Sequence, residues 1–429
     1  MTTDRLDQTR AALAPLWALK PPGPADLYRH PAFTAFKAFC ADTFPAADTG
    51  LGFSFGLSDA LRSAGLPCLM KGPALPLSLD EGAGAFVRAF ETPTVRRTYL
   101  CPLDLAGDLP EMRFGDASVR HYTASELDDL FDAPRLARHY PQLPLDSRRL
   151  AQFRWLVVEE QALAVPRAGQ RAMPFLYETL NRDYGAIEPH AGSHPAAVGD
   201  ALFGLLLAPW EDWHSLEYDW RAFSIPWIHT ASDDLFVRPR SVPSADTLTW
   251  EDASHQEYDG EIIEYQRPVH IYLDDEAEVV LAGFDPGWWV RIEAAGKTPL
   301  FETPVRHFLL RAAFSDGMDQ IMAHMTMIEA ALGLRSDSGN SSKPRMTAKG
   351  RVAKRVELLL ADPKAGVDYE AMFETRSAFV HGRAFQGTVS SKDRNLARSL
   401  ARRVAVALID VANGPAGQTT REDYLNSLA

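Results

Sequence analysis

The sequence predicts an α+β region over residues 1–302, an all-α four-helix-bundle domain over 303–414 and a tail over 415–429. Before residue 302, short helical and strand-like patterns alternate, and proline and glycine interrupt them throughout. After residue 303, apolar residues recur at helical spacing in four segments. A length of 429 residues is also too great for one ordinary domain.

In the first region, the apolar spacing predicts three helices, and Thr123 with Glu126 has the spacing of a capping box that starts a fourth. Residues 200–300 are expected to be richer in strands. The three helices are expected at Asp4–Leu19, Pro31–Cys40 and Leu57–Ala64, and strand-like runs occur at Arg97–Cys101, Pro268–Leu273, Ala277–Phe284 and Trp288–Ile292.

In the last third, four helices are expected, and a polar serine-rich stretch at Ser336–Arg345 is typical of a loop. The expected helices are Thr303–Leu334, Thr347–Leu360, Tyr369–His381 and Ser391–Ala412. The stripe expected to be buried in the first helix comprises Phe308, Leu309, Ala312, Ile321, Met325, Ile328 and Leu332.

The composition is that of a globular chain, with 46% hydrophobic and 24% charged residues. The longest apolar run, Ala201–Trp210, is about half as long as a membrane-spanning helix requires, so no membrane association is expected. The cysteines Cys40, Cys68 and Cys101 are few and far apart, which favours a cytoplasmic location over a disulfide framework. No CxxC or HExxH spacing occurs, and neither a metal nor another cofactor is expected.

The net charge of −13 is unevenly divided along the chain. From residue 303 to the end, 18 Lys and Arg stand against 13 Asp and Glu, which gives +5. Residues 1–302 therefore hold 26 basic and 44 acidic residues, which gives −18. A phosphate polymer would be repelled by the first part and tolerated by the second. A difference in surface composition that serves solubility alone is the alternative interpretation.

The segment ETRSAFVHGRAF (Glu374–Phe385) places Arg376 and His381 five residues apart. On a helix this spacing separates two side chains by roughly 140° around the axis. Gly382 is a typical helix terminator, so we expect His381 in the last turn, where the helix dipole favours a protonated imidazole.

Between the two cationic residues, Phe379 and Val380 are expected to be buried. If two copies of this helix met across a two-fold axis, two arginines and two histidines would converge on one cleft. Arg376 would there bind a phosphodiester and stabilise its transition state, and His381 would transfer protons to or from ribose oxygens. The alternative is an arginine in a surface ion pair and a histidine that caps its helix.

RSAFVH matches the R-x4-6-H motif of HEPN domains, and YEAMFETRSAFVHG resembles the Apea-like HEPN group. The resemblance covers roughly residues 303–414. It implies a homodimer of four-helix bundles and metal-independent endoribonuclease activity that leaves 2′,3′-cyclic phosphate and 5′-hydroxyl ends. It also implies a place in bacterial toxin–antitoxin or anti-phage abortive-infection defence, with a phage-derived trigger or regulatory partner at the N-terminal region.

By this resemblance, Arg376 and His381 are the catalytic residues, and Glu374, Ser377 and Arg383 are auxiliary residues near the motif. In active members of the family an Asn, Asp or His often follows the arginine, so Ser377 is a departure. A non-catalytic HEPN module for dimerisation or partner binding is therefore the alternative function.

The basic side of the second C-terminal helix is the predicted RNA-contacting surface. It contains Arg351, Lys354 and Arg355, which would steer RNA toward the motif. Exposed helices are commonly this basic, so an ordinary solvated surface is the alternative.

Overall fold

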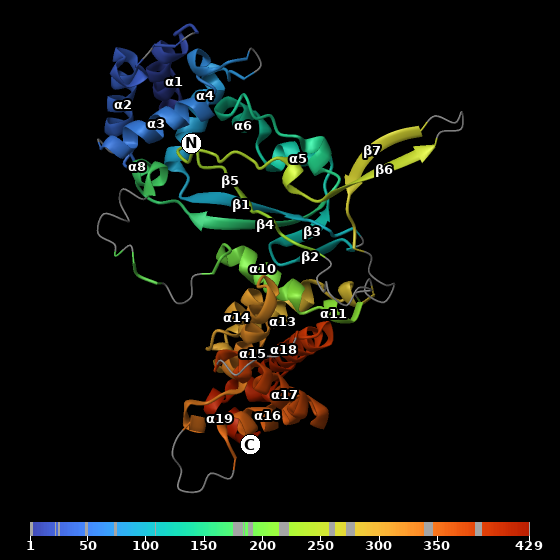
Figure 1. The fold of residues 1–429 in the computed structure, drawn as a ribbon. Helices are drawn as coiled ribbons and strands as arrows, with labels where there is room; N and C mark the ends of the chain where they lie inside the picture. Colours follow the sequence, from blue (N-terminus) through green and yellow to red (C-terminus); the bar gives the residue numbers. More distant parts are fainter. Residues whose placement is uncertain are drawn as a thin grey trace. The chain divides into compact units, whose positions relative to one another are not determined.

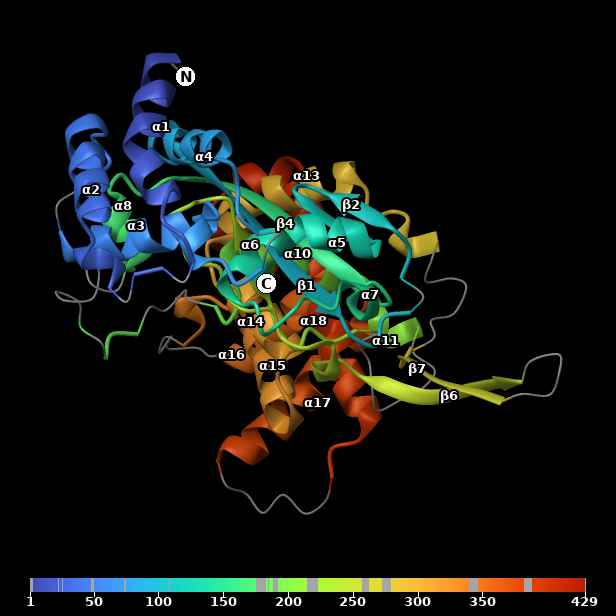
Figure 2. The ribbon, with the colours of Figure 1, turned by 90° about the horizontal axis from the view of Figure 1, so that it is seen from above.

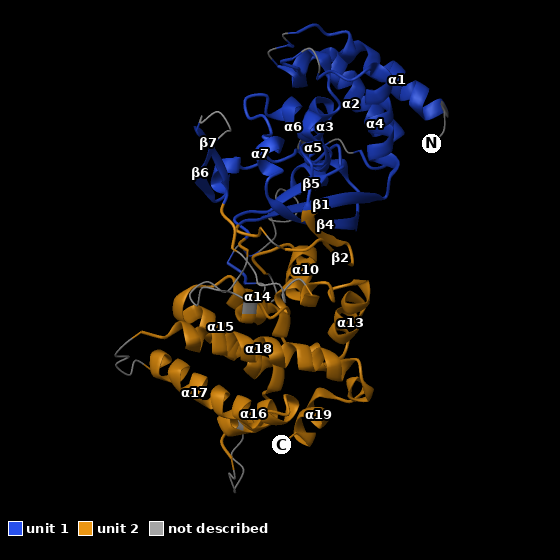
Figure 3. Cartoon of the chain, turned by 90° about the vertical axis from the view of Figure 1, so that its right-hand side faces the viewer, with its two compact units in different colours: residues 1–104, 121–187, 225–268 blue, residues 105–120, 188–224, 269–429 orange. Residues whose placement is uncertain are grey.

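The computed structural model is mixed α and β, and contacts divide it into two compact units (Figure 3). Unit 1 comprises residues 1–104, 121–187 and 225–268, and unit 2 comprises residues 105–120, 188–224 and 269–429. The boundaries expected at 302 and 414 from the sequence stay predictions. The structure describes residues 3–21, 23–24, 26–47, 50–72, 75–107, 109–174, 183, 185–187, 192–213, 223–256, 262–271, 279–338, 346–381 and 388–428.

Unit 1 begins with a group of helices that confirms the three helices expected before residue 65 (Figure 1). A proline at the first helical position starts α2, and a complete capping box between Ser78 and Glu81 starts α4. A phenylalanine-rich core lies between the helices. The helices are α1 (Thr3–Trp17), α2 (Pro31–Thr43), α3 (Leu51–Ser63), α4 (Leu79–Glu91) and α8 (Ala168–Ala172).

The sheet of unit 1 has β1 (Thr94–Leu103) between two antiparallel neighbours, β4 (Arg154–Leu163) and β5 (His229–Ser232). The expected strand at Arg97–Cys101 is confirmed within β1. Leu100 of β1 packs with Trp155 and Val157 of β4 in a second core. Three short helices follow the capping box at Thr123, which is also confirmed: α5 (Ala124–Leu130), α6 (Ala133–His139) and α7 (Ser147–Leu150).

A two-stranded antiparallel hairpin confirms that the chain between residues 200 and 300 contains strands (Figure 2). It consists of β6 (Trp250–Gln256) and β7 (Ile262–Pro268). The strand expected at Pro268–Leu273 is wrong for residues 269–271, which have no regular structure. Residues 272–278 lie outside the described residues, and 279–281 are helical, contrary to the strand expected at Ala277–Phe284.

Unit 2 is mostly helical, which confirms a helical C-terminal region (Figure 3). It also contains the antiparallel strands β2 (Met112–Phe114) and β3 (Ala117–His121), of which His121 is assigned to unit 1. The helices are α10 (Ala196–Leu206), α11 (Trp210–Trp213), α13 (Pro286–Gly296), α14 (Val305–Ala313), α15 (Gly317–Leu332), α16 (Ala348–Leu359), α17 (Pro363–Val380), α18 (Ser391–Ala412) and α19 (Arg421–Ser427).

The apolar stripe predicted along residues 303–334 faces the core of unit 2, and only Phe308 in it is partly exposed. The single helix expected there is two helices, because the chain turns at residues 314–316 and Gly317 adopts a positive φ of 57°. The strand expected at Trp288–Ile292 is wrong: these residues lie in α13, since the Asp285 side chain caps its start and Pro286 occupies the first position.

Residues 415–428, expected as a tail, are part of unit 2, and Tyr424, Leu425 and Leu428 pack in or against its core. Leu425 of α19 is fully buried. Arg421 is 9% exposed, and its guanidinium donates to the carbonyl oxygens of Ala330 and Gly333, each at 2.7 Å, at the end of α15.

A buried histidine lies between α15 and α18. His324 is 1% exposed, and neither ring nitrogen has a hydrogen-bond partner among the described residues. Burial, and secondarily the positive charge of Arg398, lowers the pKa of His324 to about 3 from its ordinary value of 6.5. The imidazole is therefore neutral in the folded protein.

We expect this histidine to make the protein less stable in mild acid. Below pH 6.5 the unfolded chain binds a proton that folded His324 does not, so the free energy of unfolding falls as pH decreases. The fall is at most about 1.4 kcal/mol per pH unit for one such group. Urea unfolding of a His324→Leu protein between pH 7 and about pH 5 should show a shallower dependence. The exposed His255→Leu variant is the control; equal slopes in both variants would contradict the assignment.

Candidate functional site

The predicted catalytic motif lies on α17, which begins six residues earlier than expected. Asp362 caps its start by accepting a hydrogen bond from the backbone N–H of Lys364 at 3.0 Å, and Pro363 takes the first helical position. The helix continues through Val380, and the backbone N–H of His381 donates to the Ser377 carbonyl at 3.0 Å. His381 is thus the C-cap residue, as its predicted place in the last turn requires.

Arg376 points toward α15 and is bound there by a carboxylate. Its Nη1 donates to Oε1 of Glu329 at 2.5 Å, and the two side chains are 25% and 29% exposed. The guanidinium carbon also lies 5.9 Å from the centre of the Phe373 ring. The charge of Arg376 is therefore largely compensated within one chain, and its orientation is set by two neighbouring side chains.

Tyr369 lies about two turns before Arg376 on α17, on the buried side of the helix, and its ring centre is 6.2 Å from that of Phe373. The residue is fully buried, and among the described residues its hydroxyl has no hydrogen-bond partner. Burial, and secondarily the negative charge of Glu329, raises the pKa of Tyr369, so the phenol stays protonated. Arg376, Glu329, Tyr369 and Phe373 together are called the Arg376 cluster below.

Glu374, predicted as an auxiliary residue, accepts a hydrogen bond from Nζ of Lys349 at 2.7 Å. The Lys349 Nζ atom also lies 5.9 Å from the centre of the Phe373 ring. This ion pair connects α16 to α17, and the Glu374 side chain is 58% exposed. A pair this exposed contributes little to stability.

The exposed end of α17 carries His381 and two apolar side chains. Phe379 is 46% exposed and Val380 54%, so their predicted burial is wrong within a single chain. His381 is also exposed, whereas Ser377 is half-buried. The structure therefore puts Arg376 against α15 and His381 in solvent at the helix end. The predictions on Gly382 and Arg383 lie outside the described residues.

Of the three predicted RNA-contacting residues, two are partly exposed. The Arg351 side chain is 30% exposed, with Nη1 3.5 Å from Oδ1 of Asp337, and the Lys354 side chain is 39% exposed and pairs with Glu357 at 2.6 Å. Arg355 is 1% exposed, so the role predicted for it is wrong. A guanidinium enclosed by its own domain does not reach an RNA backbone.

Arg355 instead joins three segments of unit 2. Its Nη1 and Nη2 donate to the two carboxylate oxygens of Asp337 at 2.5 and 3.1 Å, a bidentate pair. It also donates to the carbonyl oxygens of Leu332 at 2.8 Å and Leu425 at 3.0 Å. Burial by itself raises the pKa of Asp337, but hydrogen bonds from Arg355 and the Leu334 backbone outweigh it, and the pKa lies below its ordinary value.

The R-x4-H motif contains neither Glu329 nor Tyr369, and no role was expected for them from the sequence. A signal for Glu329 exists in the sequence, because it follows Met325 by four residues and therefore lies beside the predicted buried stripe. An acidic residue at the edge of a buried helical face requires a partner. Nothing in the sequence identifies that partner as Arg376, which is 47 residues away.

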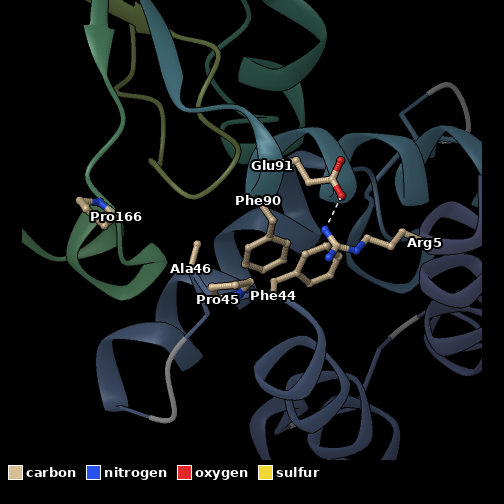
Figure 4. Close-up of a pocket in the computed structure, with 7 residues that line it drawn as sticks. All are labelled: Arg5, Phe44, Pro45, Ala46, Phe90, Glu91 and Pro166. Carbon is tan, nitrogen blue, oxygen red and sulfur yellow. Dashed lines mark hydrogen bonds and ion pairs between the residues drawn. The ribbon is translucent and has the colours of Figure 1, made fainter. Parts of the chain in front are cut away.

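A cavity of about 680 Å³ is present in unit 1 (Figure 4). Phe44 and Phe90 stack beside it with ring centres 4.3 Å apart, and an ion pair between Arg5 and Glu91 at 2.8 Å borders it. Both phenylalanines are at least 92% buried, so their rings belong to the core of this unit. The two charged side chains of the cavity compensate each other.

Comparisons of the chain with protein-family models, with curated proteins and with solved structures found no match. Within the part of the chain that the structure describes, every helix is too short or too polar to cross a bilayer. In the same part, no three His, Cys, Asp or Glu side chains are grouped as a metal site would require.

Proposed function

We propose that unit 2 contains a HEPN domain of the Apea-like group and that the protein is a metal-independent endoribonuclease. The observation that carries the proposal is the arrangement of α17. Arg376 is oriented by Glu329, and His381 lies at the exposed end of the same helix. Arg376 thus lies on α17 and His381 caps its end, so a second copy of this helix would bring a second pair of motif residues with it.

In the proposed reaction, the ribose 2′-hydroxyl attacks the adjacent phosphorus atom and the 5′-oxygen leaves. In the proposed dimer, His381 of one copy accepts the proton of the 2′-hydroxyl, and His381 of the other copy donates a proton to the leaving 5′-oxygen. Arg376 stabilises the additional negative charge on the phosphorane oxygens, using guanidinium N–H groups that Glu329 does not occupy. The products are a 2′,3′-cyclic phosphate and a 5′-hydroxyl, and the step uses only side chains of the protein.

The exposed apolar end of α17 supports assembly of two copies. Phe379 and Val380 immediately precede His381 and are about half exposed, so covering the rest of each side chain with a partner is favourable by roughly 1 kcal/mol. A second copy that covers them would bring its own His381 to the same place. Arg351 and Lys354, with the net charge of +5 over residues 303–429, would favour the approach of RNA.

The biological role that we propose is anti-phage abortive infection or toxin–antitoxin defence. The acidic residues 1–302 would sense a trigger or restrain the nuclease, and their charge of −18 disfavours RNA as their own ligand. This part of the proposal rests on the motif and on the charge division.

The test is incubation of the purified full chain with single-stranded RNA in the presence of EDTA. Cleavage with cyclic-phosphate and 5′-hydroxyl ends, by a protein whose mass in light scattering is that of a dimer, is the expected result. Products with 3′-hydroxyl ends, or a monomer that cleaves at the same rate, would overturn the shared active site.

A non-catalytic HEPN module is the second candidate, and two observations favour it. Glu329 neutralises Arg376 within one chain, and Ser377 stands where active members often have Asn, Asp or His. In this case the ion pair is structural, and His381 serves only as a helix cap. A dimer without any cleavage of RNA would support this candidate over the nuclease.

Replacement of Glu329 by glutamine separates the two candidates further. If Glu329 orients Arg376 for catalysis, loss of this charge-assisted hydrogen bond should lower kcat about tenfold with little change in KM. The exposed Glu422→Gln variant makes the same charge change elsewhere in unit 2 and should have no effect. An increase in cleavage by Glu329→Gln would mean that the carboxylate masks Arg376, which contradicts an orienting role.

A further inference from the structure

A second cavity is present in unit 2, and no residue of the Arg376 cluster lines it. Its volume is about 770 Å³, and residues from the start of α10 and from α14 line it. This size is within the range of about 300–1,000 Å³ that is usual for small-molecule sites. Nothing in the proposed nuclease mechanism uses it.

Two of the three α10 residues that line the cavity, Ala196 and Gly199, have little or no side chain, and this leaves space beside the helix. Ala196 and Gly199 are three residues apart, so they lie on the same face of the helix, and both line the cavity. A Cβ atom placed on Gly199 would lie 3.6 Å from Cδ1 of Leu310 on α14, in ordinary contact. The two helices are therefore close at Gly199, and the space opens toward the start of α10.

The opposite wall is one face of α14. His307, Leu310, Arg311 and Phe314 follow one another at intervals of three, one and three residues, and all four line the cavity. Two of these side chains are cationic or imidazole groups, and two are apolar. The ring of His194 adds a further aromatic surface, since its centre lies 4.8 Å from that of Phe314.

The charges on the cavity wall do not cancel. Arg306 is bound to Asp200, with Nη1 2.8 Å from Oδ1, and this pair is neutral as a whole. Arg311 is exposed, and among the described residues no carboxylate lies within 4.0 Å of its guanidinium. Burial lowers the pKa of His194, so this ring is neutral at neutral pH. One positive charge, on Arg311, is therefore left beside the apolar surface of Leu310 and Phe314.

We propose that this cavity binds a small organic anion, in which a phosphate or carboxylate group is attached to an aromatic ring. The anionic group accepts hydrogen bonds from the planar guanidinium of Arg311 and from the imidazole of His307, one turn earlier on α14. The ring packs against Leu310 and Phe314 in the space that Ala196 and Gly199 leave open. This inference is independent of the proposed nuclease activity.

Titration calorimetry of the full chain with phenyl phosphate tests the proposal. Inorganic phosphate supplies the charge alone, phenol the ring alone, and benzoate the ring with a carboxylate. We expect phenyl phosphate or benzoate to bind at least about tenfold more tightly than inorganic phosphate or phenol, because only these two engage both parts of the site. The stronger of the two identifies the anionic group.

Two variants locate the binding. Arg311→Glu should weaken it at least about tenfold, since it replaces the binding charge by a repelling one. Ala196→Trp should abolish it by filling the cavity, and both positions are exposed, so folding should be retained. Arg335→Glu makes the same charge change on an exposed residue outside the cavity and should leave binding unchanged. Absence of binding by both aromatic anions, or equal losses in Arg311→Glu and Arg335→Glu, would overturn the proposal.

Discussion

Cleavage of single-stranded RNA is expected to fall by at least about a hundredfold when His381 is replaced by alanine. In the proposed mechanism His381 transfers the proton, and a methyl group cannot do so. The side chain is exposed and only its backbone takes part in capping α17, so the variant should keep its fold and its oligomeric state. Initial rates measured with EDTA present, together with circular dichroism and light scattering, check all three expectations.

His255→Ala is the matched control, because this histidine is likewise exposed and lies in β6 of unit 1, outside the motif. Its cleavage rate should equal that of the unaltered protein. Cleavage by His381→Ala at the unaltered rate would remove the proposed mechanism, even if the protein proved to be a nuclease by some other site.

The second large effect is expected on stability. Replacement of Arg355 by methionine should lower the free energy of unfolding by about 3–5 kcal/mol, since it leaves a buried carboxylate without its partner. Asp337 is 8% exposed, and the carbonyl oxygens of Leu332 and Leu425 would each lose a donor in the same step. Urea unfolding followed by circular dichroism, at fixed pH and protein concentration, measures the loss.

Arg351→Met is the control for this experiment. Arg351 approaches the same carboxylate at 3.5 Å but its side chain is 30% exposed, so its loss should cost less than about 1 kcal/mol. Replacement of both partners, as Arg355→Met with Asp337→Leu, should recover part of the stability, because no buried charge then remains. Equal losses in Arg355→Met and Arg351→Met would contradict a buried ion pair.

Helices α16, α17 and α18 of unit 2 could be predicted because their signals are local. Apolar residues at helical spacing and Thr347 as a capping residue each act within a few positions of the helix that they define. The Asp362-Pro363 pair likewise marks the start of α17, which was expected six residues later. The prediction of a strand at Trp288–Ile292 was wrong because two local signals disagree there. Tryptophan, valine and isoleucine favour a strand, whereas Asp285 and Pro286 immediately before them start a capped helix.

The partners of the arginines could not be predicted, because they are distant in sequence. In the sequence, Arg355 looks like one of three basic residues on an exposed side of the helix, and helical periodicity does not show how deeply that side is buried. The carbonyl of Leu425 is 70 residues away, and the carboxylate of Glu329 is 47 residues from Arg376. Only the packing of α15 against α17, and of α16 against α19, brings these groups together.

The hydrogen bonds at the C-terminal end of α15 affect how unit 2 unfolds. A helix of seven residues such as α19 has almost no stability in isolation. Here Arg421 reaches back from it to Ala330 and Gly333, while the Leu425 carbonyl receives Arg355 of α16. Detachment of α19 therefore breaks hydrogen bonds to both α15 and α16. We therefore expect α19 to unfold cooperatively with α15 and α16, and not to fray separately.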